Sequence, residues 1–240
     1  MTTTTNCQSR PQLLMLLLLS AMILGLWQVP WLGWLVFPFR LFGTFVHELS
    51  HGLAAVLTGG DFVRFTVHPD LSGRAWSTGG VRIIVASAGY VGSVLFGAGL
   101  LLGHLRRWSA PRLLLVLGLA LGSLCLLFVR NGFGILAGLL LASALILAAA
   151  KWSVPAQDWL LRVLALQLLL DGYNSLFTVL LPTTGTIAHT DADTLAEITH
   201  LPAFFWVALW LAFSTILAWR LLRLAWINPS APPIDHPRDP

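Results

Sequence analysis

The sequence predicts an all-α polytopic membrane protein with about seven transmembrane helices and a short β-hairpin after the helix that carries an HExxH motif. Three observations support this fold class. Hydrophobic residues make up 57% of the 240 residues and charged residues only 10%, and the mean hydropathy is +0.80. Several apolar runs reach about 18 residues, the length needed to cross a bilayer. These runs are rich in Leu and Ala and lack the two-residue alternation of barrel strands, so we expect helices.

Proline, glycine and polar residues set the expected boundaries of these helices. Pro38 suits the first turn of the second helix, and Gly59 and Gly60 end it. Between positions 61 and 80 apolar and polar residues alternate, which predicts a short hairpin outside the bilayer core. A polar, acidic segment at 182–200 precedes the last helix. The expected helices cover residues 13–27, 38–60, 81–104, 112–129, 133–150, 158–181 and 204–224.

The chain divides into a polar N-terminal tail at 1–10, a membrane-embedded domain at 11–226 and a disordered, proline-rich tail at 227–240. Arg and Lys gather at the ends of apolar runs, so they give no reason to expect a nucleic acid partner. The more basic side is expected to be cytoplasmic, which places the hairpin outside. Two cysteines leave the redox compartment undetermined, and the oligomeric state is not set by the sequence.

The stretch FVHELSHGL places three ionisable side chains inside an apolar helix. Such residues cost about 2.5 to 3.5 kcal/mol each in a membrane, so partners or a function must offset them. His47 and His51 are four residues apart and can direct both imidazoles at one metal ion. Glu48 is placed to reach a water on that metal, which is the arrangement of a zinc hydrolase with a general base. The alternative is a polar helix-packing cluster without metal.

A catalytic zinc needs a third protein ligand, and Asp171 is the candidate. It belongs to a polar stripe on an otherwise apolar helix, together with Gln167, Asn174 or Ser175, and Thr178. The alternative is that this stripe only hydrogen-bonds to other helices. Other possible ligands lie in polar segments, where the stretch HTDAD is the most credible substitute: His68, His189, Asp191, Asp193 and His200.

These motifs resemble those of the site-2 protease family of intramembrane zinc metallopeptidases, closest to the compact bacterial branch without a PDZ domain. The resemblance rests on HELSH, the following TGG and hairpin, the helix SAGYVGSVLFG and the later LLDG. It implies a zinc metalloendopeptidase of the bacterial cytoplasmic membrane that cuts a transmembrane protein substrate within the lipid bilayer. It implies His47, His51 and Asp171 as zinc ligands and Glu48 as catalytic base. It also implies a cytoplasmic hairpin, in contrast to the charge-based orientation.

Two functional alternatives remain open from the sequence. The chain could be a non-catalytic metal-binding membrane protein, either a scaffold or a transporter. A transporter is expected to carry ligands on several helices or broken helices in paired halves, and neither is evident. For a protease, the hairpin edge at 62–68 is expected to hold an unwound substrate strand by β-addition.

Overall fold

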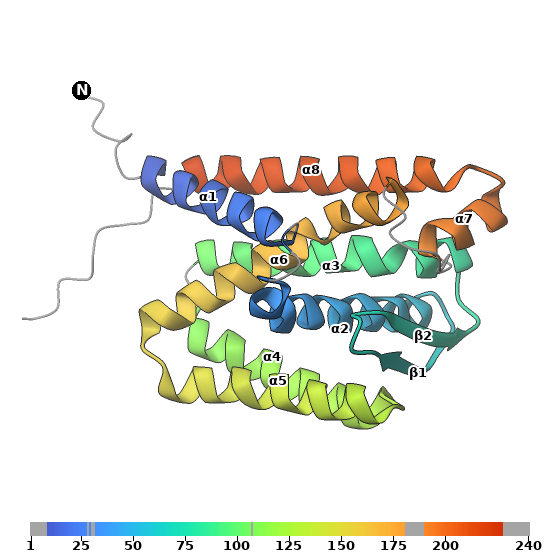
Figure 1. Cartoon of the computed structure of the whole chain (residues 1–240), viewed down its shortest axis with the longest axis horizontal. Coiled ribbons are helices and arrows are strands. Elements are labelled where there is room, and N and C mark those ends of the chain that lie inside the picture. The colour runs from blue at the N-terminus through green and yellow to red at the C-terminus, as the bar shows by residue number, and fades with distance from the viewer. Residues whose placement is uncertain (1–8, 28, 30–31, 107, 181–189, 228–240) are drawn as a thin grey trace, which may run out of the picture.

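The computed structural model describes residues 9–27, 29, 32–106, 108–180 and 190–227. Of the expected C-terminal tail at 227–240, residues 228–240 lie outside the described residues, as does most of the N-terminal tail. Helices make up most of the structure, with one two-stranded hairpin at one end of the bundle (Figure 1). The elements are α1 Ser9–Trp27, α2 Gly33–Leu57, β1 Asp61–Val67, β2 Gly73–Thr78, α3 Arg82–Leu105, α4 Ala110–Phe128, α5 Gly132–Lys151, α6 Val154–Leu180, α7 Asp191–Thr199 and α8 Ala203–Ile227.

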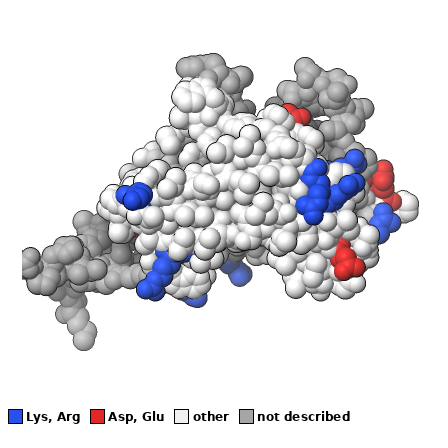
Figure 2. All heavy atoms as spheres, turned by 90° about the horizontal axis from the view of Figure 1, so that it is seen from below, with Lys and Arg blue, Asp and Glu red and all other residues white. Residues whose placement is uncertain are grey.

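Four of the described helices are long and apolar enough to cross a membrane, namely α3, α4, α5 and the part of α8 from Ala203 to Leu224. The helices α2 and α6 are also long, but polar side chains such as Glu48 and Asp171 interrupt their apolar faces. An integral membrane protein of mostly helical structure is therefore confirmed, and the total of about seven spans stays a prediction. Figure 2 shows the matching surface, an uncharged belt between two ends where charged side chains gather.

The hairpin lies alongside α2, with its tip packed into the bundle. The strands β1 and β2 are antiparallel, from the pair Asp61 and Thr78 at the open end to Val67 and Gly73 near the tip. In the tip, the Leu71 carbonyl accepts a hydrogen bond of 3.1 Å from Thr44 Oγ1 on α2. Thr44 lies about 20 Å along the helix from the end of α2. The expected hairpin is therefore confirmed, and it lies beside α2, whereas its position outside the bilayer core stays a prediction.

The outer edge of β1 is already occupied by the turn between α4 and α5. The Arg130 amide donates to the Phe65 carbonyl at 3.1 Å. The Asn131 side chain accepts from the Val67 amide at 3.2 Å and donates to its carbonyl at 2.6 Å. These bonds replace the ladder that an added strand would need. At Phe65 and Val67 the edge that was expected to hold a substrate strand is thus already bonded within the protein, and β2 forms the other side of the hairpin.

The helix α3 packs closely against both α2 and α6. Its small residues Gly89, Ser93 and Gly97 are buried at four-residue spacing. A Cβ at Gly97 would lie 2.6 Å from the Ala165 carbonyl oxygen of α6, so only glycine permits this approach of the two backbones. Because α3 is wedged between α2 and α6, it brings the HELSH helix and the Asp171 helix to the same part of the interior.

Candidate metal centre

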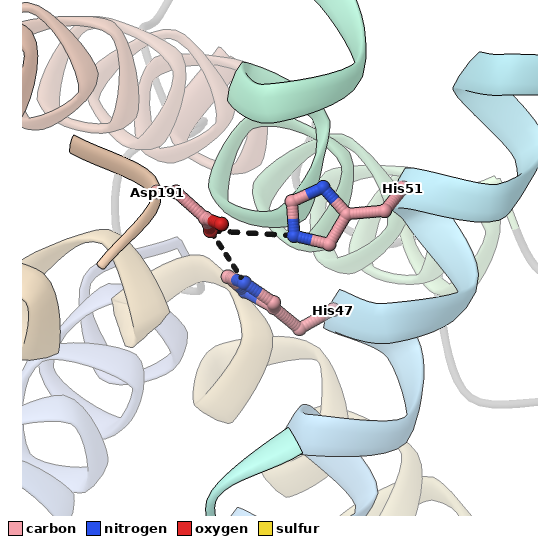
Figure 3. Close-up of side chains that lie close together, drawn as sticks. All are labelled: His47, His51 and Asp191. Carbon is pink, nitrogen blue, oxygen red and sulfur yellow. Dashed lines mark hydrogen bonds and ion pairs between the residues drawn. The ribbon is translucent and has the colours of Figure 1, made fainter. Parts of the chain in front are cut away.

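The two histidines of the HELSH motif point at one place beside α2. Their ring centroids are 4.9 Å apart, and Asp191, the first residue of α7, approaches both rings (Figure 3). Its Oδ2 lies 3.0 Å from Nε2 of His47 and 3.3 Å from Nε2 of His51. One ligand atom from each residue lies within 4.8 Å of the others. In the described part of the chain, this is a group of side chains that could hold a metal ion.

The Nδ1 atoms of the two rings have partners of their own. Nδ1 of His51 lies 2.7 Å from the carbonyl oxygen of Val85 on α3. A carbonyl oxygen only accepts hydrogen bonds, so the proton of the neutral ring resides on Nδ1 and the Nε2 lone pair is free. Nδ1 of His47 lies 3.6 Å from Oδ2 of Asp171 on α6. Metal-binding histidines commonly have such a carbonyl or carboxylate behind the ring, which fixes its orientation.

Asp171, the third ligand that the sequence predicts, lies close to the site but on the far side of the His47 ring from Asp191. Its Oδ2 is buried and has no hydrogen-bond partner among the described residues. Asp171 and Gln167 both line the cavity beside His47. The side chains of Asn174, Ser175 and Thr178 lie outside the described residues. Asp171 as a ligand stays a prediction, whereas Asp191 is the carboxylate that the structure brings to both Nε2 atoms.

Glu48 is buried, with 5% of its surface exposed. It faces the hairpin at Gly73, where an added Cβ would lie 2.7 Å from the Glu48 Cδ atom. The glycine therefore makes room for the carboxylate. Glu48 also borders both cavities that reach the two histidines, one of about 380 Å³ and one of about 450 Å³. A polar side chain in this place can contact a water or a substrate group entering from either cavity.

The residues fit a zinc ion by donor chemistry and by space. Two neutral imidazoles and one carboxylate, with a fourth position open, make up a known catalytic zinc set. The space next to the nitrogens depends on Gly89 of α3, because a Cβ there would lie 2.5 Å from Nε2 of His51 and would overlap the His47 ring. Any side chain at position 89 would fill the space beside the two Nε2 atoms, which is the space that a metal ion would occupy.

The helix α7 holds Asp191 in place. Thr190 caps its start, since Thr190 Oγ1 accepts from the Asp193 amide at 3.2 Å and Asp193 accepts from the Thr190 amide at 2.9 Å. The other face of α7 buries Ala192 and Leu195 in a small cluster with residues of α3 and α8, namely Ala86, Val207 and Trp210. Packing of this cluster therefore sets the distance of Asp191 from the histidines.

The charge state of Asp191 suits a metal ligand. Burial alone would raise the pKa of this carboxyl, but His51 and His47 in their protonated state outweigh burial and lower the pKa below its ordinary value. A carboxylate that remains ionised at neutral pH offers two oxygens to a cation. Asp191 therefore has both the position and the charge that a third ligand requires.

The remaining candidates from the sequence have other roles or lie elsewhere. The His68 amide bonds to the Ser72 carbonyl in the hairpin turn, Asp193 caps α7 and His200 ends α7 with a φ of 59°. His189 lies outside the described residues. The sequence did contain one signal for α7, the capping box formed by Thr190 and Asp193, which places Asp191 in the first turn of a helix.

A family model described as Peptidase M50B-like matches residues 15–221 of the chain. The chain belongs to the Peptidase M50B-like family. This match confirms the site-2 protease resemblance, and with the apolar helices it makes the chain an integral membrane member of a metallopeptidase family. A search of curated proteins and a search of solved structures gave no significant match.

Proposed function

We propose that this M50B-like protein is an intramembrane zinc metalloprotease that hydrolyses peptide bonds of transmembrane protein substrates. The observation that carries the proposal is the meeting of His47, His51 and Asp191 beside a buried Glu48. Bound zinc would supply an acidified water and polarise the substrate carbonyl. The family match supports the class of reaction, and the apolar helices support a substrate that lies in the same bilayer.

His47, His51 and Asp191 are the proposed zinc ligands. Asp171 is then a positioning residue, because it lies 3.6 Å from Nδ1 of His47, the ring nitrogen that does not point at Asp191. In this place the negative charge of the carboxylate favours the ring proton on Nδ1, which leaves the Nε2 lone pair directed at the metal. The sequence-based assignment of Asp171 as a direct ligand is the competing hypothesis. The two hypotheses differ in whether removal of the Asp191 or of the Asp171 carboxylate causes the larger loss of zinc affinity.

Glu48 is the proposed general base. It accepts a proton from the attacking water and then delivers it to the leaving amine. Its position at the border of both cavities supports this role, because the scissile peptide bond must pass the same point. The absent side chain of Gly73 leaves space for the Glu48 carboxylate between α2 and the hairpin. With the outer edge of β1 occupied, β2 is the part of the hairpin that can contact a substrate.

The chain offers a matched pair of variants to test this function, since Glu48 and Glu197 are its two glutamates. The probe is a zinc-loaded reaction in detergent with a tagged single-span reporter whose membrane segment is weakened by glycine and serine. Glu48→Gln is expected to slow cleavage by at least about a hundredfold and to retain zinc. Glu197→Gln is expected to cleave like the wild type. Cleavage by Glu48→Gln at the wild-type rate, or no cleavage by the wild type, contradicts the proposal.

A further inference from the structure

Two cavities meet at the metal centre, and they differ in charge. Both are lined by Glu48, Gly73, Thr190 and Asp191. A peptide bond placed at the centre would therefore have one flank of the substrate in each cavity. Glu48 and Asp191 contribute their charges to both cavities, so the difference in charge between the cavities comes from the other lining residues.

The first cavity is acidic beyond the shared residues, and the second is basic. The first, of about 380 Å³, adds Asp70 and Asp171 and the single cation Arg40. The second, of about 450 Å³, adds Arg74 and Arg82 and no further carboxylate. We name the second cavity the β2–α7 cleft. The Arg74 guanidinium lies over the Trp76 ring, 5.8 Å from the ring centroid, so Arg82 is the cation on which the difference between the cavities rests.

The walls of the β2–α7 cleft leave room for an extended chain. The β2 side presents Gly73, Ala75, Ser77 and Gly79, which are alternate positions with small side chains. At about 3.3 Å per residue these positions span about 20 Å, enough for several residues of an extended peptide. The α7 side presents Thr194 and Ile198. The cleft is therefore bounded by a bare strand face and one helix face, with Arg82 at the start of α3.

We propose that the β2–α7 cleft is a substrate subsite that binds an extended segment on one flank of the scissile bond and selects an acidic side chain there through Arg82. This inference rests on the proposed function and names the substrate class of the same site. A guanidinium forms charge-assisted hydrogen bonds with a carboxylate of the substrate. A substrate lysine in place of that acidic residue would be repelled by the positive charge of the arginine. The acidic first cavity would not favour a carboxylate on the opposite flank, so the substrate is held in one direction.

A panel of peptides with one apolar backbone sequence tests the charge preference. Each peptide carries Asp, Asn or Lys at one position, and the products of the zinc-loaded chain are identified by mass spectrometry. On one flank only, Asp is expected to raise kcat/KM roughly tenfold over Asn, and Lys is expected to lower it. Arg82→Glu should reverse this order. Arg64→Glu, a matched charge change on β1 outside both cavities, should leave it unchanged.

A binding measurement separates this inference from the proposed function. The Glu48→Gln variant, loaded with zinc, is titrated with the fluorescent Asp and Lys peptides. If the Asp peptide binds more tightly than the Lys peptide and Arg82→Glu removes this difference, the subsite is supported. If in addition no peptide is cut, the proposed protease function is contradicted and the subsite is not. Cleavage that is independent of peptide charge overturns the subsite and leaves the protease function standing. Absence of both binding and cleavage overturns both.

A pair of size variants tests the position of the peptide. Ser77 lines the cleft, whereas its neighbour Thr78 is exposed and does not line it. Ser77→Leu is expected to weaken binding of every peptide several-fold while the zinc content stays unchanged, and Thr78→Leu should bind like the wild type. Equal peptide binding by the two variants would place the substrate elsewhere.

Discussion

At the residue scale, the metal centre depends on residues that make space as much as on those that donate atoms. His47 and His51 converge because they are one helical turn apart, and Asp191 meets them at 3.0 and 3.3 Å. Gly89 and Gly73 carry no side chain at the two points where a Cβ would overlap a histidine ring or Glu48. The sequence shows the donors directly, but the requirement for these glycines follows only from how α3 and the hairpin approach α2.

Gly89→Ala is expected to abolish zinc binding without unfolding the protein. The added methyl group would displace both imidazoles from their common point, while alanine itself favours helix over glycine. Zinc content and helical circular dichroism of the purified variant measure the two effects. Gly99 is the control, since it lies on the same helix with nothing within 4 Å of its Cβ position. If Gly89→Ala binds zinc as tightly as Gly99→Ala, the space beside the two Nε2 atoms is not the metal site.

At the element scale, α7 is the part of the site that the sequence analysis did not predict as a helix. The polar segment at 182–200 lacks an apolar run that would predict a helix, and Asp191 lies 144 residues from His47 along the chain. Only the packing of Ala192 and Leu195 against α3 and α8 brings it to the histidines. Spacing within α2 predicted two ligands and the base, whereas tertiary contacts of this kind cannot be derived from periodicity.

The polar stripe on α6 led to the prediction of Asp171, and the structure does bring Asp171 to the site. The predicted ligand role requires Asp171 to lie near the histidines, and its Oδ2 lies 3.6 Å from Nδ1 of His47. The polar stripe cannot determine which ring nitrogen a carboxylate meets, because that depends on the rotation of α6 and on the orientation of the His47 ring. The hairpin was predicted as a hairpin, but its insertion beside α2 depends on Thr44 and Asn131, which bond its tip and outer edge.

Leu195→Ala is expected to weaken zinc binding through the position of α7. Leu195 is fully buried, and truncation of such a residue costs about 2 to 5 kcal/mol of local packing. We expect the zinc dissociation constant to rise roughly tenfold because Asp191 is then less firmly placed. Competition with a chelator measures this constant. Leu209→Ala on exposed α8 surface is the control, and equal zinc affinity in the two variants would show that α7 does not position the ligand.

At the scale of the whole molecule, the charges of the two ends differ. The hairpin end holds acidic and basic residues together, with Asp61, Asp70, Asp193 and Glu197 near Arg64, Arg74, Arg82 and Arg130. The opposite end is basic: Arg106, Arg112, Lys151, Arg162, Arg220 and Arg223. The excess of Arg and Lys at one end predicts that this end faces the cytoplasm and that the metal centre opens towards the other side.

Cysteine labelling tests this orientation. In a Cys7→Ser background, Cys125 is buried and unreactive to a membrane-impermeant maleimide. Thr78→Cys at the hairpin end is expected to label in bacterial spheroplasts, and Ser153→Cys, between α5 and α6 at the basic end, is expected to label only after permeabilisation. The reverse pattern would place the hairpin in the cytoplasm, as the family resemblance implies.

The proposed function depends on one metal ion held by His47, His51 and Asp191, and zinc analysis of the purified chain tests it most directly. Elemental analysis with X-ray absorption is expected to show one zinc per chain, bound by two imidazoles and by oxygen and not by sulfur. Asp191→Ala should lose the zinc, while Asp171→Ala should keep it with about 10- to 100-fold weaker affinity. Full zinc occupancy in Asp191→Ala, or no zinc in the wild type, would contradict the proposed function.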